Sequence, residues 1–96
     1  MIMSVTDALR AIRGHIANGW CQRQNEDAAG NCCLNGAFCR VLVMDYDERR
    51  EVFASEAFIS NLIGVCWASW NDAPGRTQAE VLELLDQAIV NSMAKA

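Results

Sequence analysis

The side chains of this sequence that are most able to do chemistry are five cysteines and one histidine. They are Cys21, Cys32, Cys33, Cys39, Cys66 and His15. A structural zinc site usually draws on pairs such as Cys-x-x-Cys, which place two ligands on one turn, and no cysteine spacing here forms such a pair. We therefore predict no metal site. We expect His15 to be a half-buried structural residue and Cys33 and Cys39 to be small core residues.

Motifs of the common catalytic classes are missing from the sequence. It contains no glycine-rich phosphate loop, no nucleophile elbow and no motif of paired catalytic carboxylates. A thiol nucleophile would need a base and a group that orients that base, and His15 is the only histidine. We therefore expect no enzyme and no cofactor. A thiol or metal enzyme built on Cys21, Cys33 and His15 is the third hypothesis for the function.

A short polar segment precedes the last predicted helix. Pro74 and Gly75 fit the two central positions of a type II turn, because proline presets one backbone angle and glycine accepts the positive one. Asn71 and Asp72 have side chains that bond nearby backbone amides, and Arg76 is close enough in sequence to pair with Asp72. This segment is either a connector that satisfies its own polar groups or a surface that binds a ligand. We favour the connector for Asp72 and recognition for Arg76.

Two tryptophans stand beside this segment. Trp67 and Trp70 are three positions apart, so they share a face if this stretch is helical. Tryptophan and arginine dominate the hot spots of protein interfaces, although such residues more often fill a small core. The candidate binding residues are therefore Trp67, Trp70, Asn71, Asp72 and Arg76.

The first helix is predicted to run from Ser4 to Asn18. Ser4 can cap it, Asp7 stands three positions later as in a capping box, and four apolar residues repeat along one face. Those residues are Val5, Leu9, Ile12 and Ile16. Gly19 predicts a left-handed stop after the helix. Residues 20–31 are polar and show no period, so we expect a loop there.

Three further helical segments follow this loop. Apolar residues from Leu34 to Leu42 repeat at helical spacing, although the run Val41–Met44 also fits a short buried strand; we favour helix. Residues 47–64 carry apolar side chains on nearly every face, which is typical of a buried or two-sided helix. Thr77 and Glu80 form a capping box before the apolar face of the last helix. The sequence therefore predicts an all-α fold in a single domain of 96 residues. We expect a compact bundle of about four helices with a polar loop after the first helix.

The composition limits the partners and the compartment. The formal net charge is −4 and the acids are scattered, so the surface lacks the basic stripe that phosphate contacts need, and we expect no nucleic-acid binding. No run approaches the roughly 20 apolar residues of a membrane span, so we expect no membrane insertion. Without a recognisable export signal, we expect a cytoplasmic protein with reduced thiols. Hydrophobic residues make up 52% of the chain, and this excess favours either a dense helical core or a surface buried against a second copy; we favour a homo-oligomer.

Three short motifs resemble those of a known protein family. They are Gly-Trp-Cys-Gln at 19–22, Cys-Leu-x-Gly-Ala at 33–37 and Trp-Asn-Asp-x-x-x-Arg-Thr at 70–77. In combination they resemble a family of small bacterial and bacteriophage proteins that is described only as a domain of unknown function. The resemblance covers most of the chain, although residues 23–31 are more polar and acidic than the family pattern. It implies a compact helical fold in a bacterial or bacteriophage setting, and it brings no activity, cofactor or catalytic residue.

Together these features favour a binding protein over an enzyme. We expect a non-catalytic binding module, an accessory protein of a phage or bacterium that engages a host protein or a second copy of itself. A small apolar-rich domain with an aromatic and arginine corner suits that role. The alternative is a protein that binds a small nucleotide-like ligand, with Trp70 for stacking and Arg76 for charge.

Overall fold

The computed structural model describes residues 4–44 and 49–94, in which the chain forms five helices and no strand. The helices are α1 (Val5–Asn18), α2 (Leu34–Met44), α3 (Arg49–Ile63), α4 (Trp67–Asn71) and α5 (Gln78–Ala94). Four of them are long, so the predicted all-α bundle is confirmed. The run Val41–Met44 belongs to α2, and its interpretation as helix is confirmed. The helix predicted at 47–64 is α3, although its first two positions lie outside the described residues.

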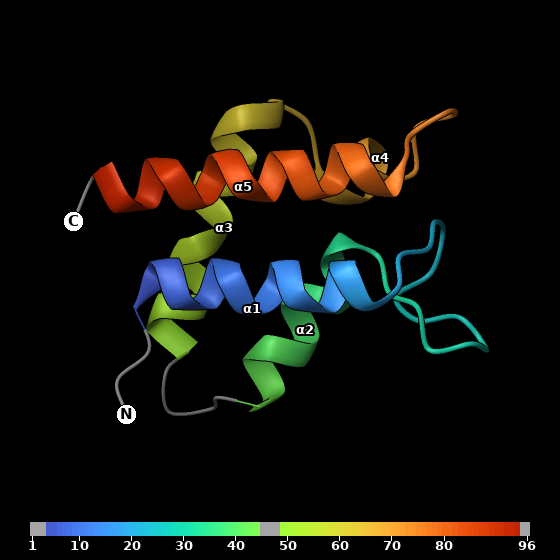
Figure 1. Cartoon of the computed structure of the whole chain (residues 1–96), viewed down its shortest axis with the longest axis horizontal. Helices are drawn as coiled ribbons and strands as arrows, with labels where there is room; N and C mark the ends of the chain where they lie inside the picture. The colour runs from blue at the N-terminus through green and yellow to red at the C-terminus, as the bar shows by residue number, and fades with distance from the viewer. Residues whose placement is uncertain (1–3, 45–48, 95–96) are drawn as a thin grey trace.

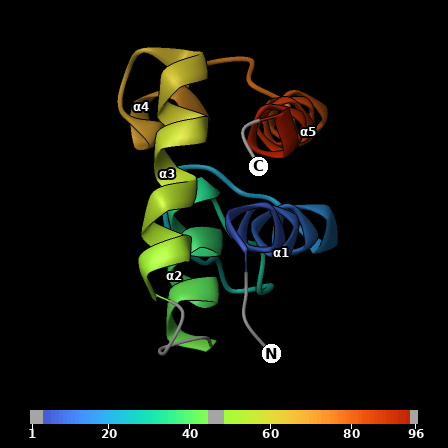
Figure 2. The same cartoon turned by 90° about the vertical axis from the view of Figure 1, so that its left-hand side faces the viewer.

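The four long helices form two antiparallel pairs that cross each other. α1 and α5 lie side by side and run in opposite directions (Figure 1). α2 and α3 form the second pair, which Figure 2 shows along its length while the first pair is seen end-on. The short helix α4 packs against one end of this second pair. The loop of residues 20–33 (the 20–33 loop) and the turn before α5 lie at the same end of the molecule (Figure 1).

One hydrophobic core lies between the two helix pairs. Its largest fully buried apolar side chains come from all four long helices: Leu9, Ile12, Ile16, Leu34, Val52, Ile59, Val81 and Leu85. Burying each of these side chains stabilises the fold by roughly 2 kcal/mol. Hydrogen bonds fix the register of α1 against α5 at both ends. The hydroxyls of Thr6 and Ser92 lie 2.7 Å apart, and Nε2 of Gln78 donates to the carbonyl of Ile16 at 2.8 Å.

Both helices of the first pair begin with the predicted capping box. Oγ of Ser4 accepts from the backbone N of Asp7 at 3.0 Å, and the Asp7 carboxylate accepts from the backbone N of Ser4 at 3.1 Å. At α5, Oγ1 of Thr77 accepts from Glu80 N at 3.2 Å, and the Glu80 carboxylate accepts from Thr77 N at 2.9 Å. The backbone bonds lower the pKa of both carboxyl groups. Each cap therefore satisfies amide donors that the first turn of a helix leaves free.

Gly19 ends α1 for a different reason from the predicted one. Its φ is 163°, which is extended backbone, so the predicted left-handed stop is wrong. A Cβ at this position would lie 2.0 Å from Oδ1 of Asn31. The backbone N of Cys32 also donates to the Gly19 carbonyl at 2.9 Å. Glycine at this position leaves room for the Asn31 side chain at the far end of the 20–33 loop.

No helix in the two described stretches is long and apolar enough to cross a membrane.

Thr77→Ala is expected to lower the free energy of unfolding by about 1 kcal/mol, because it removes the acceptor of the Glu80 N–H at the start of α5. Chemical denaturation measures this change. Glu83→Ala, at an exposed position of the same helix, is the matched control and is expected to cost less than about 0.5 kcal/mol. Equal losses from the two substitutions would show that the hydroxyl cap does not stabilise α5.

Candidate functional site

The side-chain amide of Asn71 is fully buried and makes four hydrogen bonds. Its Oδ1 accepts from the indole Nε1 of Trp20 at 2.8 Å and from the backbone N of Leu34 at 3.2 Å. Its Nδ2 donates to the carbonyl of Cys21 at 3.2 Å and to Oδ1 of Asp72 at 3.0 Å. These bonds use the full hydrogen-bonding capacity of a side-chain amide. They join the end of α4 to both ends of the loop between α1 and α2.

Neighbouring bonds hold the start of that loop against the residues that follow α4. Nε2 of Gln22 donates to the carbonyls of Asn71 and Ala73, at 3.0 and 3.1 Å. The backbone N of Arg23 donates to Oδ1 of Asp72 at 2.8 Å. Arg23 has a φ of 72°, a left-handed conformation that is unfavourable for a residue with a Cβ and persists only where surrounding contacts hold it. Asp72, which was favoured as a connector residue, thus bonds the distant 20–33 loop and not only groups of its own segment.

Arg76 folds back over Trp70. Its Cζ lies 3.8 Å from the centroid of the Trp70 ring, and its Nε donates to the Trp70 carbonyl at 2.9 Å. Its Nη1 lies 3.4 Å from the carboxylate of Glu80, so Arg76 pairs with Glu80 instead of the expected Asp72. The φ of 81° at Gly75 agrees with the predicted type II turn. The guanidinium therefore covers one face of the tryptophan ring.

Trp67 is a core residue. Its ring packs edge-on against Phe38 with the centroids 5.2 Å apart, and its Nε1 donates to Oγ of Ser60 at 2.8 Å. Because Trp67 is buried, it does not share an exposed aromatic platform with Trp70. Among the five candidate binding residues, the structure brings Trp70 together with Arg76 and joins Asn71 to Asp72. Their recognition of a ligand stays a prediction.

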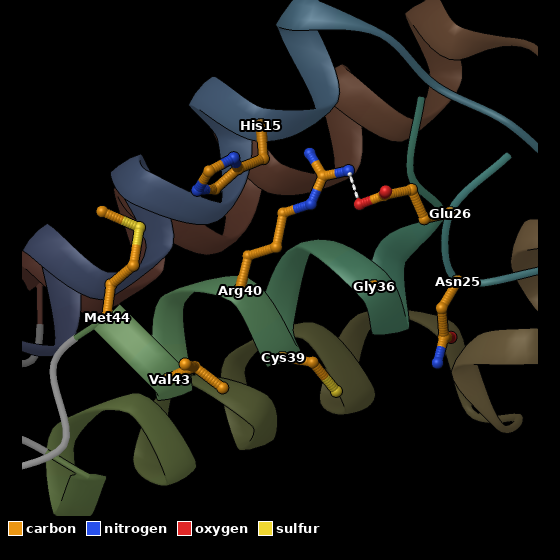
Figure 3. A pocket seen from close by; sticks show the side chains of 8 residues that line it. All are labelled: His15, Asn25, Glu26, Gly36, Cys39, Arg40, Val43 and Met44. Atoms are coloured by element: carbon orange, nitrogen blue, oxygen red, sulfur yellow. Dashed lines mark hydrogen bonds and ion pairs between the residues drawn. The ribbon is translucent and has the colours of Figure 1, made fainter. Parts of the chain in front are cut away.

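A hollow of about 410 Å³ lies between α1 and α2, at a different place from the predicted binding residues (Figure 3). We call it the α1–α2 hollow. It is lined by His15 of α1, by Asn25 and Glu26 of the loop, and by Gly36, Cys39, Arg40, Val43 and Met44 of α2. Its surface is mostly carbon, with a few polar groups, which is the usual character of a binding pocket.

Close packing of the loop on α2 builds one end of the hollow. A Cβ at Gly36 would lie 2.0 Å from the carbonyl oxygen of Asn25, so a residue other than glycine would displace the loop backbone. The backbone N of Cys33 also donates to this carbonyl, at 3.4 Å. Arg40 and Val43 stand four and seven positions after Gly36 and therefore lie on the same face of the helix. One face of α2 thus forms the floor of the hollow.

Arg40 supplies the positive charge of the hollow. Its Nη2 donates to Oε1 of Glu26 at 2.5 Å and to the carbonyl of Gly30 at 2.9 Å. The hydrogen bond to Glu26 raises the pKa of Arg40, so the guanidinium stays charged. Its Nε and Nη1 have no hydrogen-bond acceptor in the described part of the chain. Part of the guanidinium is therefore free to bind a group that enters the hollow (Figure 3).

His15 lies on α1 across from Arg40 and is half-buried, as predicted. Burial lowers the pKa of His15, and the positive charge of Arg40 lowers it further, so the imidazole is neutral at pH 7. Cys39 was expected in the core, and that prediction is wrong because its side chain is exposed at the hollow. Val43 and Met44 are also exposed, by 78% and 75%. The hollow therefore combines a neutral ring, a partly free guanidinium and an apolar rim.

Two thiols of the 20–33 loop, those of Cys21 and Cys32, have raised pKa values. Burial raises the pKa of Cys21, and the charge of Asp27 raises it further; burial also raises the pKa of Cys32. A thiol with a raised pKa holds less of the reactive thiolate at pH 7. Cys33 is buried, as predicted. Within residues 4–44 and 49–94, no three histidine, cysteine or acidic side chains gather where they could hold a metal ion.

Reasoning from the sequence missed the hollow. The signal that was available is the helical spacing of Gly36, Arg40 and Val43, followed directly by Met44. This spacing places a small residue, a charge and apolar groups on one face of a helix. The hollow also needs the loop residues Asn25 and Glu26, and their position depends on bonds to distant parts of the chain.

Asn71→Ala is expected to lower the free energy of unfolding by about 3 kcal/mol or more, because it leaves the buried Leu34 N–H and other groups without their partner. Urea denaturation measures this change. Asn61→Ala, at an exposed position of α3, is the matched control and should cost less than about 0.5 kcal/mol. A loss below about 1 kcal/mol for Asn71→Ala would contradict a structural role for the buried amide.

Acidification from pH 7 to pH 5 is expected to destabilise the protein through His15. Because the pKa of His15 is lower in the folded state, the unfolded chain binds more protons in this range, and stability falls as the pH falls. The loss begins near pH 6.5, the ordinary histidine pKa, and is complete below the folded-state value. Thermal unfolding should show a smaller decrease in Tm for His15→Gln than for the wild type. The carboxyl groups with lowered pKa act in the same direction only near pH 4 and below. Equal decreases in the two proteins would contradict the prediction.

Comparison with known proteins gives one match. Residues 2–91 match the model of a family described as "Family of unknown function (DUF6197)". This range includes α1 to α4 and most of α5. No curated protein and no solved structure matches the chain. The predicted membership of a family of unknown function is confirmed: the chain belongs to the DUF6197 family.

Proposed function

We propose that this protein is a non-catalytic binding module that engages a partner protein through the α1–α2 hollow. The observation that carries this proposal is the mostly carbon lining of the hollow beside the exposed side chains of Val43 and Met44. Contact with a partner would remove these two side chains from water, and burial of each would contribute roughly 2 kcal/mol to association. Methionine adapts its shape to an incoming side chain, which suits a docking surface.

A partner protein fits this surface better than a substrate does. The polar groups of the hollow include a neutral histidine and an ion pair, and the nearby thiols of Cys21 and Cys32, with raised pKa values, hold little reactive thiolate. Apolar side chains beside a hollow are typical of protein interfaces, where an anchor residue fills the cavity. In the bacterial or bacteriophage setting that the sequence motifs imply, the partner is a host protein.

The alternative function, binding of a nucleotide-like ligand at Trp70 and Arg76, has less support. A stacked base needs a free ring face, and the guanidinium of Arg76 occupies one face of Trp70 at 3.8 Å. Arg76 also bonds the Trp70 carbonyl and pairs with Glu80. These contacts hold the turn between α4 and α5.

Selection of peptides from a displayed random library tests the proposed function. The wild-type protein is expected to enrich peptides with a shared apolar position. Val43→Asp should weaken their binding at least about tenfold, because it places a charge in an apolar contact. Val90→Asp, at a valine of α5 that is 57% exposed, is the matched control and should leave binding unchanged. Circular dichroism verifies that both variants are folded.

Three outcomes would contradict the proposal. If no peptide is enriched, the protein is not a peptide-binding module. If enriched peptides bind Val43→Asp as tightly as the wild type, the hollow is not the binding site. If, in addition, Arg76→Ala abolishes their binding, the binding site lies at Trp70 and Arg76. If sedimentation shows a dimer that Val43→Asp dissociates, the occupant is a second copy of the chain and not a host protein.

A further inference from the structure

We infer that the α1–α2 hollow recognises an acidic segment of its partner, in which an apolar side chain enters the hollow and a neighbouring carboxylate binds Arg40. This inference rests on the proposed function and names the chemistry of the partner.

The hydrogen-bond donors of Arg40 are only partly used. Both bonds to Glu26 and Gly30 come from Nη2, and Nε and Nη1 have no acceptor among the described residues. In the free protein, water can bond these donors. A partner that covers the apolar lining expels that water, and donors left without an acceptor would then cost binding free energy. A partner that fits the hollow must therefore bring an acceptor to Arg40.

Charge makes a carboxylate the best acceptor. The Arg40 side chain is 27% exposed, whereas the Glu26 side chain is 60% exposed and is largely hydrated. Water screens the charge of Glu26 more strongly than that of Arg40, so a positive potential remains over the hollow. The His15 ring responds to this potential: besides burial, the charge of Arg40 lowers its pKa. Charge-assisted bonds from arginine to carboxylate are also about twice as strong as neutral ones.

The apolar and charged parts of the hollow lie close enough for one segment to reach both. Arg40 lies three positions before Val43 and four before Met44, so the guanidinium and the apolar rim are one helical turn apart on α2. A carboxylate and an apolar side chain that are neighbours in a peptide match this spacing. The net charge of −4 opposes nonspecific binding of an acidic segment to the surface as a whole.

The experiment uses peptides enriched on the wild-type protein in the library selection. They are expected to carry Asp or Glu beside the shared apolar residue. One enriched peptide and its Glu→Gln (or Asp→Asn) counterpart are labelled and titrated by fluorescence anisotropy against the wild type, Arg40→Met and Glu26→Gln. Loss of the peptide carboxylate should weaken binding to the wild type about tenfold, and Arg40→Met should bind both peptides equally weakly. Glu26→Gln should strengthen binding of the acidic peptide about threefold, because it removes the competing carboxylate.

Arg40→Met is expected to weaken peptide binding and Glu26→Gln to strengthen it, and these opposite changes in affinity separate recognition from a structural role. Both substitutions break the ion pair between Arg40 and Glu26, so a pair that only supports the loop would weaken binding in both variants. If Val43→Asp abolishes peptide binding but Arg40→Met binds the peptides as tightly as the wild type, this inference is wrong. The proposed function would still be supported. An absence of enriched peptides overturns both. If Arg40→Met does not fold, the peptide pair and Glu26→Gln decide the question without it.

Discussion

The buried amide of Asn71 is the contact through which distant parts of this small chain hold one another in place. Its oxygen accepts from groups 51 and 37 positions away in the sequence, on Trp20 and Leu34. Its nitrogen donates to the carbonyl of Cys21 and to the next side chain. A long polar loop would otherwise have few apolar contacts to fix it, and loops of this kind are usually mobile. One fully satisfied amide therefore connects the helical core to the loop that shapes the surface.

The loop in turn forms one wall of the α1–α2 hollow, and its own side chains shape its tip. Oδ1 of Asp27 accepts from the backbone N of Ala29 at 3.0 Å and of Asn31 at 2.9 Å, and its Oδ2 accepts from the Asn31 side chain at 3.0 Å. These bonds with Asn31 are the main reason that the pKa of Asp27 is lowered. Gly36 then allows the loop backbone to lie directly on α2. The position of Glu26 beside Arg40 follows from both arrangements, so the charge of the hollow depends on contacts outside it.

Local signals in the sequence were sufficient to predict the long helices. They were insufficient to predict contacts between residues that are distant in sequence. The capping boxes at Ser4 and Thr77 and the apolar periodicity of α1 and α5 act within a few residues, and these predictions are confirmed. Asn71 was expected to bond nearby backbone amides, but the backbone groups that it bonds, on Leu34 and Cys21, are far away in sequence and could not be inferred from spacing. The same limit explains why the role of Gly19 was not predicted: its neighbour in space is Asn31, at the other end of the loop.

The α1–α2 hollow was harder to predict than the helices, because tryptophans beside an arginine are the more prominent surface candidates in the sequence. Trp67 lies in the core and Trp70 is covered on one face by Arg76, as happens when a small domain uses its large side chains for packing. The hollow instead combines one face of a helix with a loop, and a single sequence does not show which loop residues meet which helix.

Hydrogen exchange at the backbone amide of Leu34 tests the central role of Asn71 most directly. Leu34 is the first residue of α2, so its N–H has no acceptor within the helix and bonds Oδ1 of Asn71 at 3.2 Å. If this amide anchors the loop to the core, the Leu34 N–H should exchange only through global unfolding, at the rate of the best-protected amides of α1 and α5. Exchange as fast as that of the exposed first-turn amides of α5 would contradict the account.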